Sequence, residues 1–439
     1  MTAVTFSLAL LGALLAWRVR PALALCVYCA GLFLYPQDLT LPIGRADFSL
    51  SRILIVVVLG NAILGAKLQS SFRWAWIDTL VCVAYLLAFA ALLYTFPAIA
   101  LERHGGKFFD TLLPYFAVRL IVTDEEACAT LVKSLTLMAL PLVVFAVYEM
   151  VSSNNVVALL TGSNSWQHGA HQHYLRLGMH RAAVTFAHPI AFGMFCSMVA
   201  PLGLSLWGSR GWPDAWLVAL ILVSCLGVFA SLSAGPLLSL VFSGLVFVAY
   251  WNWRPVVGFA LTAVILLAGV GWYTDRQYVD LLASLTFDAR NAIYRVGLIR
   301  EALDGGMSGH WLTGYGYVGV GPGTDNTNFH WQHPDIVNLY LQHLVRTGLL
   351  GLTPYLLVNA LYYLHLFKAF SSATTSAAGW LPLCVFAAML GWNAAMMTVG
   401  ALSQTQQLLY IGIALSANMP LIVSKMQPSD DGFEARHVA

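Results

Sequence analysis

The chain has 439 residues, of which 59% are hydrophobic and only 10% are charged, with a mean hydropathy of +0.74. Soluble domains carry about 25% charged residues, so this composition excludes a soluble globular protein and indicates a polytopic membrane protein. The net charge of +2 and the lack of a basic block argue against nucleic acid as a partner. The lipid bilayer is therefore the expected surrounding of the chain.

The cysteines and the N-terminus limit the class further. All seven cysteines fall within apolar stretches or at their edges, which predicts small buried side chains and neither a disulfide framework nor a zinc site. Arg18 and Arg20 follow the first apolar run instead of preceding it, so we expect no cleavable signal.

Long apolar segments predict an all-α polytopic fold with 12 or 13 transmembrane helices. Asp110 and Pro114 interrupt the fifth segment, which leaves a re-entrant segment open as an alternative to a span. The segments are 3–17, 21–36, 50–66, 76–95, 108–122, 127–151, 186–207, 215–232, 235–251, 255–273, 339–367, 380–399 and 405–423.

Lys and Arg fall at alternate turns between these segments, and such residues are enriched on the cytoplasmic side. Both long polar segments then lie on the non-cytoplasmic side. The residues that set this orientation are Arg18, Arg20, Lys67, Arg73, Lys133, Arg210, Arg254, Lys368 and Lys425. The expected organisation is N-terminal helices over 1–151, a first outer loop over 152–185, central helices over 186–273, a large outer loop over 274–337, C-terminal helices over 338–426 and a cytoplasmic tail over 427–439.

The first outer loop is rich in cationic and imidazole side chains, including Arg176, Arg181 and His188, and residues 151–190 contain no Asp or Glu. Arginine binds phosphate in a bidentate manner and stays charged, so the loop is a candidate anion site, with an ordinary hydrated loop as the alternative. His168, His171 and His173 have a spacing that resembles a metal-ligand pattern, but chance clustering is the favoured interpretation and no metal site is predicted.

The large outer loop carries Arg290, Arg295 and Arg300 at intervals of five residues. The pattern predicts an amphipathic helix over 289–303 at the membrane interface, with Ile293, Val296 and Ile299 or Arg300 near one face. Its arginines either bind an anion or simply reach lipid headgroups, and Asp288 and Asp304 are possible ion-pair partners.

A glycine-rich turn follows, around Gly314 and Gly316. Phosphate binding and a purely structural turn are both compatible with this pattern, and the structural turn is favoured. Where the chain returns to apolar sequence, His343 and Arg346 share a helix face and are candidates to line a cavity, with a hydrated helix end as the alternative. Gly348 and Gly351 allow a break or close packing just after them.

Three motifs in order resemble the O-antigen polymerase and O-antigen ligase (Wzy/WaaL) superfamily of bacterial inner-membrane proteins. Arg181-Ala-Ala-Val-Thr-Phe-Ala-His188-Pro189 is similar to the family's R-x-x-G-T-F-x-H-P stretch. Arg295 with Gly314-Tyr315-Gly316 looks like its R…G-x-G segment. Val337-Asn338-Leu339-Tyr340-Leu341, followed by Gly348-Leu349-Leu350-Gly351, looks like its H-N-x-Y-L…G-L-L-G signature.

Two positions depart from the family pattern. Val337 stands where the family usually has histidine, which leaves the catalytic base open between His333, the first candidate, and Asp335. The stretch Ser231-Leu-Ser-Ala-Gly235 stands where many members carry an arginine.

The resemblance implies glycan transfer at the periplasmic face, from an undecaprenyl-diphosphate-linked donor to an acceptor sugar hydroxyl. Because Val337 departs from the usual ligase signature, we expect an enzyme that polymerises lipid-linked repeat units into exopolysaccharide or O-antigen. The site lacks an obvious acidic cage, so we expect no metal and no cofactor. The expected partners are the lipid-linked glycan donor, a glycan or lipid A–core acceptor, the bilayer and, as a further candidate, a chain-length regulator. The alternatives are an O-antigen ligase of lipopolysaccharide biosynthesis, and a flippase or export component without chemistry.

The resemblance also supplies the expected roles of individual residues. Arg181 and Arg295 would stabilise the departing diphosphate, and His333 or Asp335 would take the acceptor proton. The expected substrate-binding residues are Arg290, Arg176, His188, Asn338, Tyr340, Gly314 and Gly316.

Overall fold

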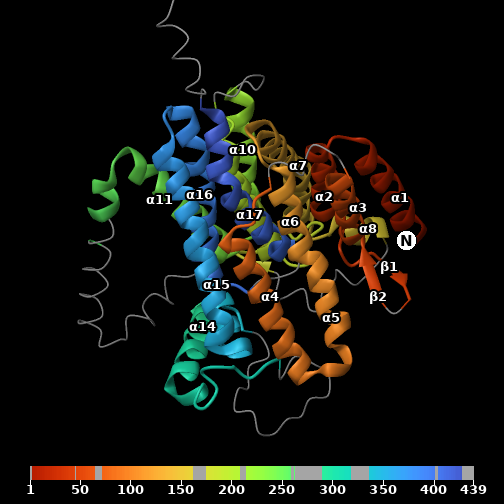
Figure 1. The fold of residues 1–439 in the computed structure, drawn as a ribbon, viewed down its shortest axis with the longest axis vertical. Coiled ribbons are helices and arrows are strands. Elements are labelled where there is room, and N and C mark those ends of the chain that lie inside the picture. The colour runs from red at the N-terminus through yellow and green to blue at the C-terminus, as the bar shows by residue number, and fades with distance from the viewer. Residues whose placement is uncertain are drawn as a thin grey trace, which may run out of the picture.

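The protein is almost wholly helical (Figure 1). A computed structural model describes residues 2–44, 46–64, 72–161, 175–207, 214–258, 262, 289–317, 336–400 and 404–427. The helices are α1 (Thr2–Arg18), α2 (Pro21–Phe33), α3 (Leu50–Leu64), α4 (Trp76–Thr95), α5 (Pro97–Asp110), α6 (Leu112–Ile121), α7 (Glu125–Ser152), α8 (Val156–Thr161), α9 (Pro189–Leu204), α10 (Asp214–Ala230), α11 (Ala234–Trp251), α14 (Ala289–Glu301), α15 (Leu339–Ser372), α16 (Ser376–Met396) and α17 (Gln404–Met426).

Six of the described helices are long and apolar enough to cross a membrane: α4, α7, α11, α15, α16 and α17. Five more are apolar but shorter, namely α1, α2, α3, α9 and α10. These helices confirm the prediction of a helical membrane protein. The count of 12 or 13 spans and the sides on which the loops lie stay predictions.

The helices run between two ends of the bundle that differ in their polar residues. One end, which we call the site end, is where α7, α10 and α16 end and where α9, α11 and α17 begin. The opposite, basic end lies towards the top of Figure 1. Its basic residues are Arg73, which precedes α4, Arg254, which follows α11, and Lys425 in the last turn of α17. These are three of the basic residues from which the orientation is predicted.

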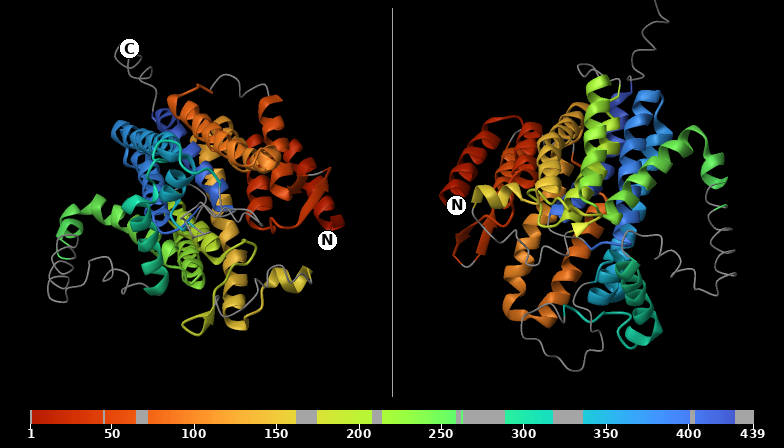
Figure 2. Two further views of the ribbon diagram at one scale, coloured as in Figure 1. Left: turned by 90° about the horizontal axis from the view of Figure 1, so that it is seen from below. Right: turned by 180° about the vertical axis from the view of Figure 1, so that it is seen from behind.

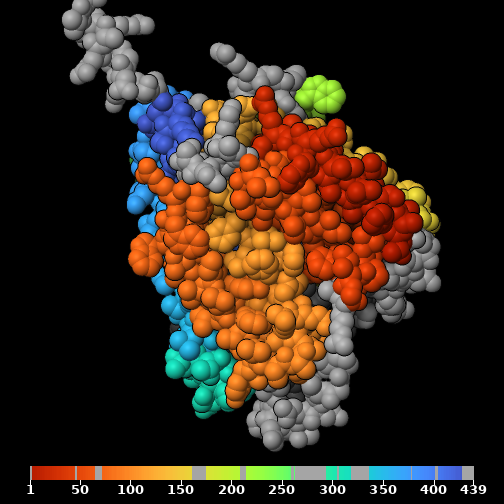
Figure 3. Space-filling model, turned by 45° about the vertical axis from the view of Figure 1, so that its right-hand side comes forward, coloured from red at the N-terminus to blue at the C-terminus, as the bar shows by residue number. Residues whose placement is uncertain are grey.

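α14, the start of α15 and the turn between α4 and α5 lie below the rest of the site end in Figure 1. α9 lies in the interior, and almost all of its residues are buried. Figure 2 shows the same arrangement from below and from behind, and Figure 3 shows α1–α3 beside α4–α6 on one face.

Two short hairpins were not predicted. β1 (Thr40–Ile43) pairs with β2 (Ala46–Ser49), and β3 (Leu175–Arg176) pairs with β4 (Met179–His180), both in antiparallel fashion. They are too short to give a clear alternating pattern. All seven cysteines are free, as expected from their positions in apolar stretches.

The segment around Asp110 crosses the bundle in two pieces. α5 begins beside the site end, where Thr95 accepts a hydrogen bond from Tyr317 N at 3.2 Å. α6 ends at the basic end, where Arg119 Nη2 donates to the carbonyl of Arg73 at 3.0 Å. The chain therefore runs through the bundle instead of re-entering it. α5 begins eleven residues before position 108, where the predicted apolar segment starts. The sequence pattern missed the first part of this helix because charged side chains lie on its exposed face.

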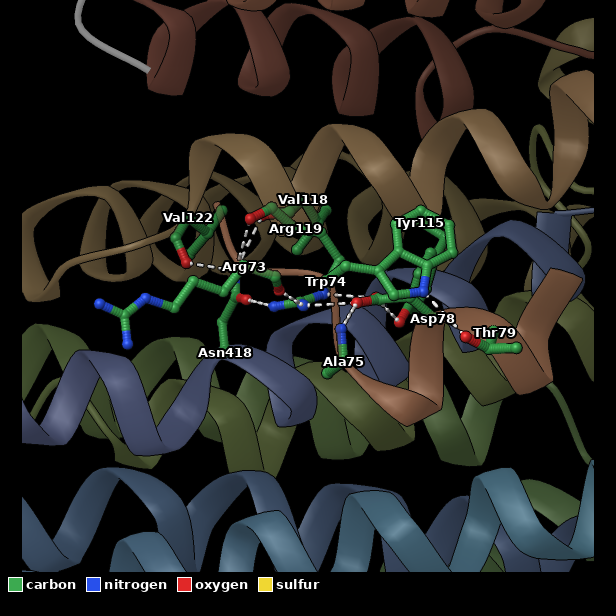
Figure 4. A network of polar contacts seen from close by, with 10 residues as sticks. All are labelled: Arg73, Trp74, Ala75, Asp78, Thr79, Tyr115, Val118, Arg119, Val122 and Asn418. Atoms are coloured by element: carbon green, nitrogen blue, oxygen red, sulfur yellow. Dashed lines mark hydrogen bonds and ion pairs between the residues drawn. The ribbon is translucent and has the colours of Figure 1, made fainter. Parts of the chain in front are cut away.

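A buried polar network fixes α6 to α4 and α17 (Figure 4). Arg119 donates two hydrogen bonds of 2.8 Å to the carboxylate of Asp78, which is fully buried. Asn418 Nδ2 donates to the carbonyls of Val118 and Arg119 in the last turn of α6 and to that of Val122, the residue that caps it. Helix ends carry unpaired carbonyls, so a single asparagine on α17 replaces the water that is absent from an apolar bundle.

We predict that Asp78→Ala destabilises the protein by about 3–5 kcal/mol, because it leaves the buried guanidinium of Arg119 without its counter-ion. The measurement is thermal unfolding of the purified protein in detergent. The matched control is Glu126→Gln, which removes an ion pair with Arg20 whose side chains are 87% and 84% exposed. A midpoint for Asp78→Ala as high as that of the control would contradict the prediction.

Candidate functional site

Arg181 is fixed at the turn between α10 and α11. Its side chain is buried, its Nε donates to the carbonyl of Ser231 at 3.3 Å, and its Nη2 donates to Ser233 Oγ at 2.8 Å. Nearby, Ala182 N donates to the carbonyl of Ala230 at 3.1 Å. A guanidinium is planar and rigid, so two bonds to one turn set its direction. Arg181 is thus a pre-oriented cation at the site end.

The same turn holds a second predicted residue. Arg176 Nη1 donates to the carbonyl of Leu232 at 2.9 Å, so the structure brings Arg176 and Arg181 to one place. Ser231 and Ser233 belong to the stretch in which many members of the Wzy/WaaL superfamily carry an arginine. In this chain those two serines hold an arginine that comes from a different segment.

An acid also lies against this loop. Glu149, near the end of α7, is buried and accepts hydrogen bonds from Val184 N at 2.9 Å and Asn155 Nδ2 at 3.1 Å. His180 Nδ1 lies 3.9 Å from Glu149 Oε1. The expectation of a surface without a local acid is wrong around His180. The sequence window 151–190 contains no acid, but the packing of α7 places one beside the loop.

His188 caps α9. Its Nδ1 accepts a hydrogen bond from Ile190 N at 3.1 Å, and Pro189 occupies the first position of the helix. Two residues earlier, Phe186 packs into the core between Phe33 and Phe195, with ring centroids 6.0 and 5.6 Å away. These contacts give the R-A-A-V-T-F-A-H-P segment a fixed shape, and a contact between His188 and substrate stays a prediction.

The first turns of α17 join this loop to α5. Gln404 Nε2 donates to the carbonyl of Thr185 at 3.1 Å, and one turn later Gln407 Nε2 donates to Asp110 Oδ1 at 3.1 Å. Arg52 binds the same carboxylate through Nε at 3.1 Å and Nη2 at 2.6 Å. Sequence reasoning missed this cluster. The available signal was the polar run Gln404-Thr-Gln-Gln407 at the start of an otherwise apolar helix.

α15 is broken at Gly348, as its glycines allow. Gly348 has φ 61° and ψ −163°, outside helical geometry. Across the break, Tyr315 N donates to the carbonyl of Val345 at 2.7 Å, and Gly316 N donates to that of Arg346 at 3.0 Å. These bonds satisfy carbonyls at the end of the first half of α15.

The amides at the start of the second half of α15 find hydrogen-bond partners in the same segment. Leu349 N donates to the carbonyl of Trp311 at 2.8 Å, and Leu350 N donates to that of Leu312 at 3.1 Å. Residues 311–316 therefore serve both sides of the break. The amides of Gly314, Tyr315 and Gly316 all donate to protein carbonyls, which gives the turn a structural role. A substrate contact through other atoms of Gly314 and Gly316 stays a prediction.

The remaining predicted residues lie on α14, on α15 or outside the described part of the chain. Asn338 caps α15, accepting from Leu341 N at 3.0 Å, and the ring of Tyr340 lies 5.8 Å from that of Tyr355. Arg295 is half-buried on α14, and only the backbone of Arg290 is described. His333 and Asp335, the two candidate bases, lie outside the described residues.

α14 confirms the predicted helix. Leu298 and Ala302 are buried against the first half of α15, whereas Ile293 is 53% and Ile299 is 39% exposed. The helix therefore uses a neighbouring stripe for packing. The two isoleucines remain on the surface, where the interfacial prediction would place lipid.

The segment just after α16 lies between the α10–α11 turn, which holds Arg181, and the start of α15. A Cβ atom built on Gly235, at the start of α11, would lie 2.6 Å from Val399 Cγ2. A Cβ atom built on Gly400 would lie 3.4 Å from the carbonyl of Ile336, just before α15. The turn that holds Arg181 and the first half of α15 thus border the same short segment.

Within the described residues, no three His, Cys, Asp or Glu side chains gather as a metal site, and His168, His171 and His173 lie outside them. No protein-family model matches the chain, and no curated protein matches it.

We predict that Gly348→Ala prevents correct folding, because its Cβ would lie 2.3 Å from the carbonyl oxygen of Leu312 in a backbone conformation that L-residues rarely adopt. The measurement is the yield of monodisperse protein after size-exclusion chromatography. The control is Gly244→Ala on α11, where a Cβ meets nothing within 4 Å and should leave the yield unchanged. Equal yields of both variants would show that the break at Gly348 is dispensable.

Proposed function

We propose that the protein is a membrane glycosyltransferase that polymerises undecaprenyl-diphosphate-linked repeat units at the non-cytoplasmic face of a bacterial inner membrane. The observation that carries the proposal is Arg181, a buried cation held in one direction by Ser231 and Ser233. It lies at the site end, opposite the basic end that contains Arg73, Arg254 and Lys425.

The reaction suits such a cation. The oxygen of an acceptor hydroxyl attacks the anomeric carbon of the donor sugar, and the bond from that carbon to the diphosphate oxygen breaks. The lipid diphosphate leaves with the electron pair, and the acceptor proton passes to a base, for which His333 and Asp335 are the candidates. A fixed guanidinium stabilises the negative charge that develops on the leaving group without having to reorganise.

The surroundings of Arg181 support this role. An apolar bundle strengthens electrostatic interactions, so a cation fixed there acts strongly on an anion that forms beside it. The Arg181 segment is also anchored by Glu149, Gln404 and the Phe186 ring, so the position of the cation is defined from several sides. Arg295 is proposed as a second contact to the diphosphate, from α14.

We predict that Arg181→Gln lowers the rate of polymer formation by about 100-fold, the usual effect of removing one donor to a developing anion. The assay contains purified protein in liposomes and undecaprenyl-diphosphate-linked repeat units, with product ladders resolved by gel electrophoresis. Arg254→Gln, an exposed arginine beyond α11 at the basic end, is the matched control and should retain full activity.

Ser233→Ala keeps the guanidinium but removes one bond that orients it, so a loss of rate smaller than that of Arg181→Gln is expected. Unchanged ladders from a folded Arg181→Gln variant would overturn the proposal. Transfer only to added lipid A–core would identify a ligase instead. Movement of lipid-linked sugar without covalent transfer would identify a flippase.

A further inference from the structure

Tyr317 connects the broken helix to the α4–α5 hairpin. It directly follows the segment that bridges the break in α15, and its amide donates to Thr95 Oγ1 at 3.2 Å. The side chain is 8% exposed and packs with Leu92 and Ala100. A tyrosine from the large outer loop is therefore enclosed between α4, α5 and α15.

Two cations from different helices converge on this ring. Lys107 Nζ, on α5, lies 4.9 Å from the ring centroid and 3.3 Å from the hydroxyl oxygen of Tyr317. Arg346 Cζ, in the last turn before the break in α15, also lies 4.9 Å from the centroid. The two cationic groups are thus separated by no more than twice that distance. Aromatic rings attract cations to their faces, so Tyr317 places both charges in defined positions.

Arg346 and Lys107 are both held in place. The carbonyl of Arg346 accepts from Gly316 N, and its Nη1 and Nη2 each lie 3.1 Å from the amide oxygen of Gln342. Lys107 lies one turn before the end of α5, where Thr111 Oγ1 donates to its carbonyl at 2.6 Å. Both side chains are half-buried, so they are accessible in part while remaining fixed.

The nearest described acid on α5 is committed elsewhere. Asp110, one turn after Lys107, accepts two bonds from Arg52 and one from Gln407. Its charge is therefore balanced by Arg52. Two fixed cations around one tyrosine, whose hydroxyl lies 3.3 Å from Lys107 Nζ, match an anion that carries two charged groups.

We propose that Lys107, Tyr317 and Arg346 form a second diphosphate-binding site, which holds the diphosphate that the acceptor retains during chain elongation. This inference rests on the proposed function, because a polymerase joins two lipid-linked molecules and only one of them loses its diphosphate. Arg181 serves the leaving diphosphate from the α10–α11 turn. Lys107 and Arg346 serve the other diphosphate from α5 and α15, across the segment around Gly400.

The test is equilibrium binding of radiolabelled farnesyl diphosphate, a sugar-free isoprenyl diphosphate, to the purified full chain in detergent. Wild type is expected to bind two equivalents. Lys107→Gln and Arg346→Gln are each expected to weaken one site by about tenfold or more, since a hydrogen bond to a charged group contributes roughly 1.5–3 kcal/mol. Arg181→Gln should weaken the other site only.

Lys368→Gln, the same exchange at the exposed basic end of α15, is the matched control and should bind two equivalents. Lys107→Arg keeps the charge and should also bind two, with thermal unfolding confirming that each variant is folded. Two equivalents bound with unchanged affinity by Lys107→Gln would overturn the inference.

Other outcomes separate this inference from the proposed function. One equivalent in wild type, lost only in Arg181→Gln, would overturn the second site and leave the proposed function standing. No binding to wild type would overturn both. If phosphatidylglycerol vesicles displaced the radiolabelled farnesyl diphosphate equally from both sites, each would be a general phosphate site. That outcome would also overturn the assignment.

Discussion

The break in α15 is the constraint on which the rest of the site end depends. A helix interrupted within an apolar bundle exposes carbonyls on one side and amides on the other, and neither can be satisfied by lipid. Residues 311–316 supply partners to both sides with four backbone hydrogen bonds. Because that segment is tied to the break, Tyr317 and Arg346 are placed relative to each other. Residues 311–317 are thereby built into the bundle.

The cations of the site end are positioned by hydrogen bonds and ion pairs that their guanidinium groups make. Arg181 is bound to a turn carbonyl and a serine, Arg346 to Gln342, and Arg52 to Asp110. A charge held by fixed groups needs little rearrangement when an anion forms beside it, which is what the proposed transfer from a lipid diphosphate requires. The basic end uses its charges differently, since the Arg119–Asp78 pair is neutral, buried and committed to holding α6 in place.

The sequence predicted the helices well because apolar runs of membrane-crossing length are an unambiguous signal. It also predicted the helix beginning at Ala289 and allowed the break at Gly348. It failed for α5, whose exposed Glu102 and Arg103 hide a crossing helix.

Contacts between residues far apart in the sequence could not be predicted. Glu149 meets Val184, and Gln407 meets Asp110 across 297 positions, and neither pair leaves a local pattern. The sequence around Gly314 and Gly316 was compatible with phosphate binding and with a structural turn. Only the hydrogen-bond partners of their amides reveal the structural role. The choice of Arg181 rested on a motif, whereas Lys107 had no motif to draw attention to it.

The most direct measurement is a cryo-EM map of the full chain in lipid nanodiscs with bound undecaprenyl diphosphate. Density for the two phosphates within hydrogen-bonding distance of the Arg181 guanidinium, at the site end of the bundle, is the expected result. Phosphate density at the basic end beside Arg73 or Lys425, with none near Arg181, would contradict the proposed chemistry.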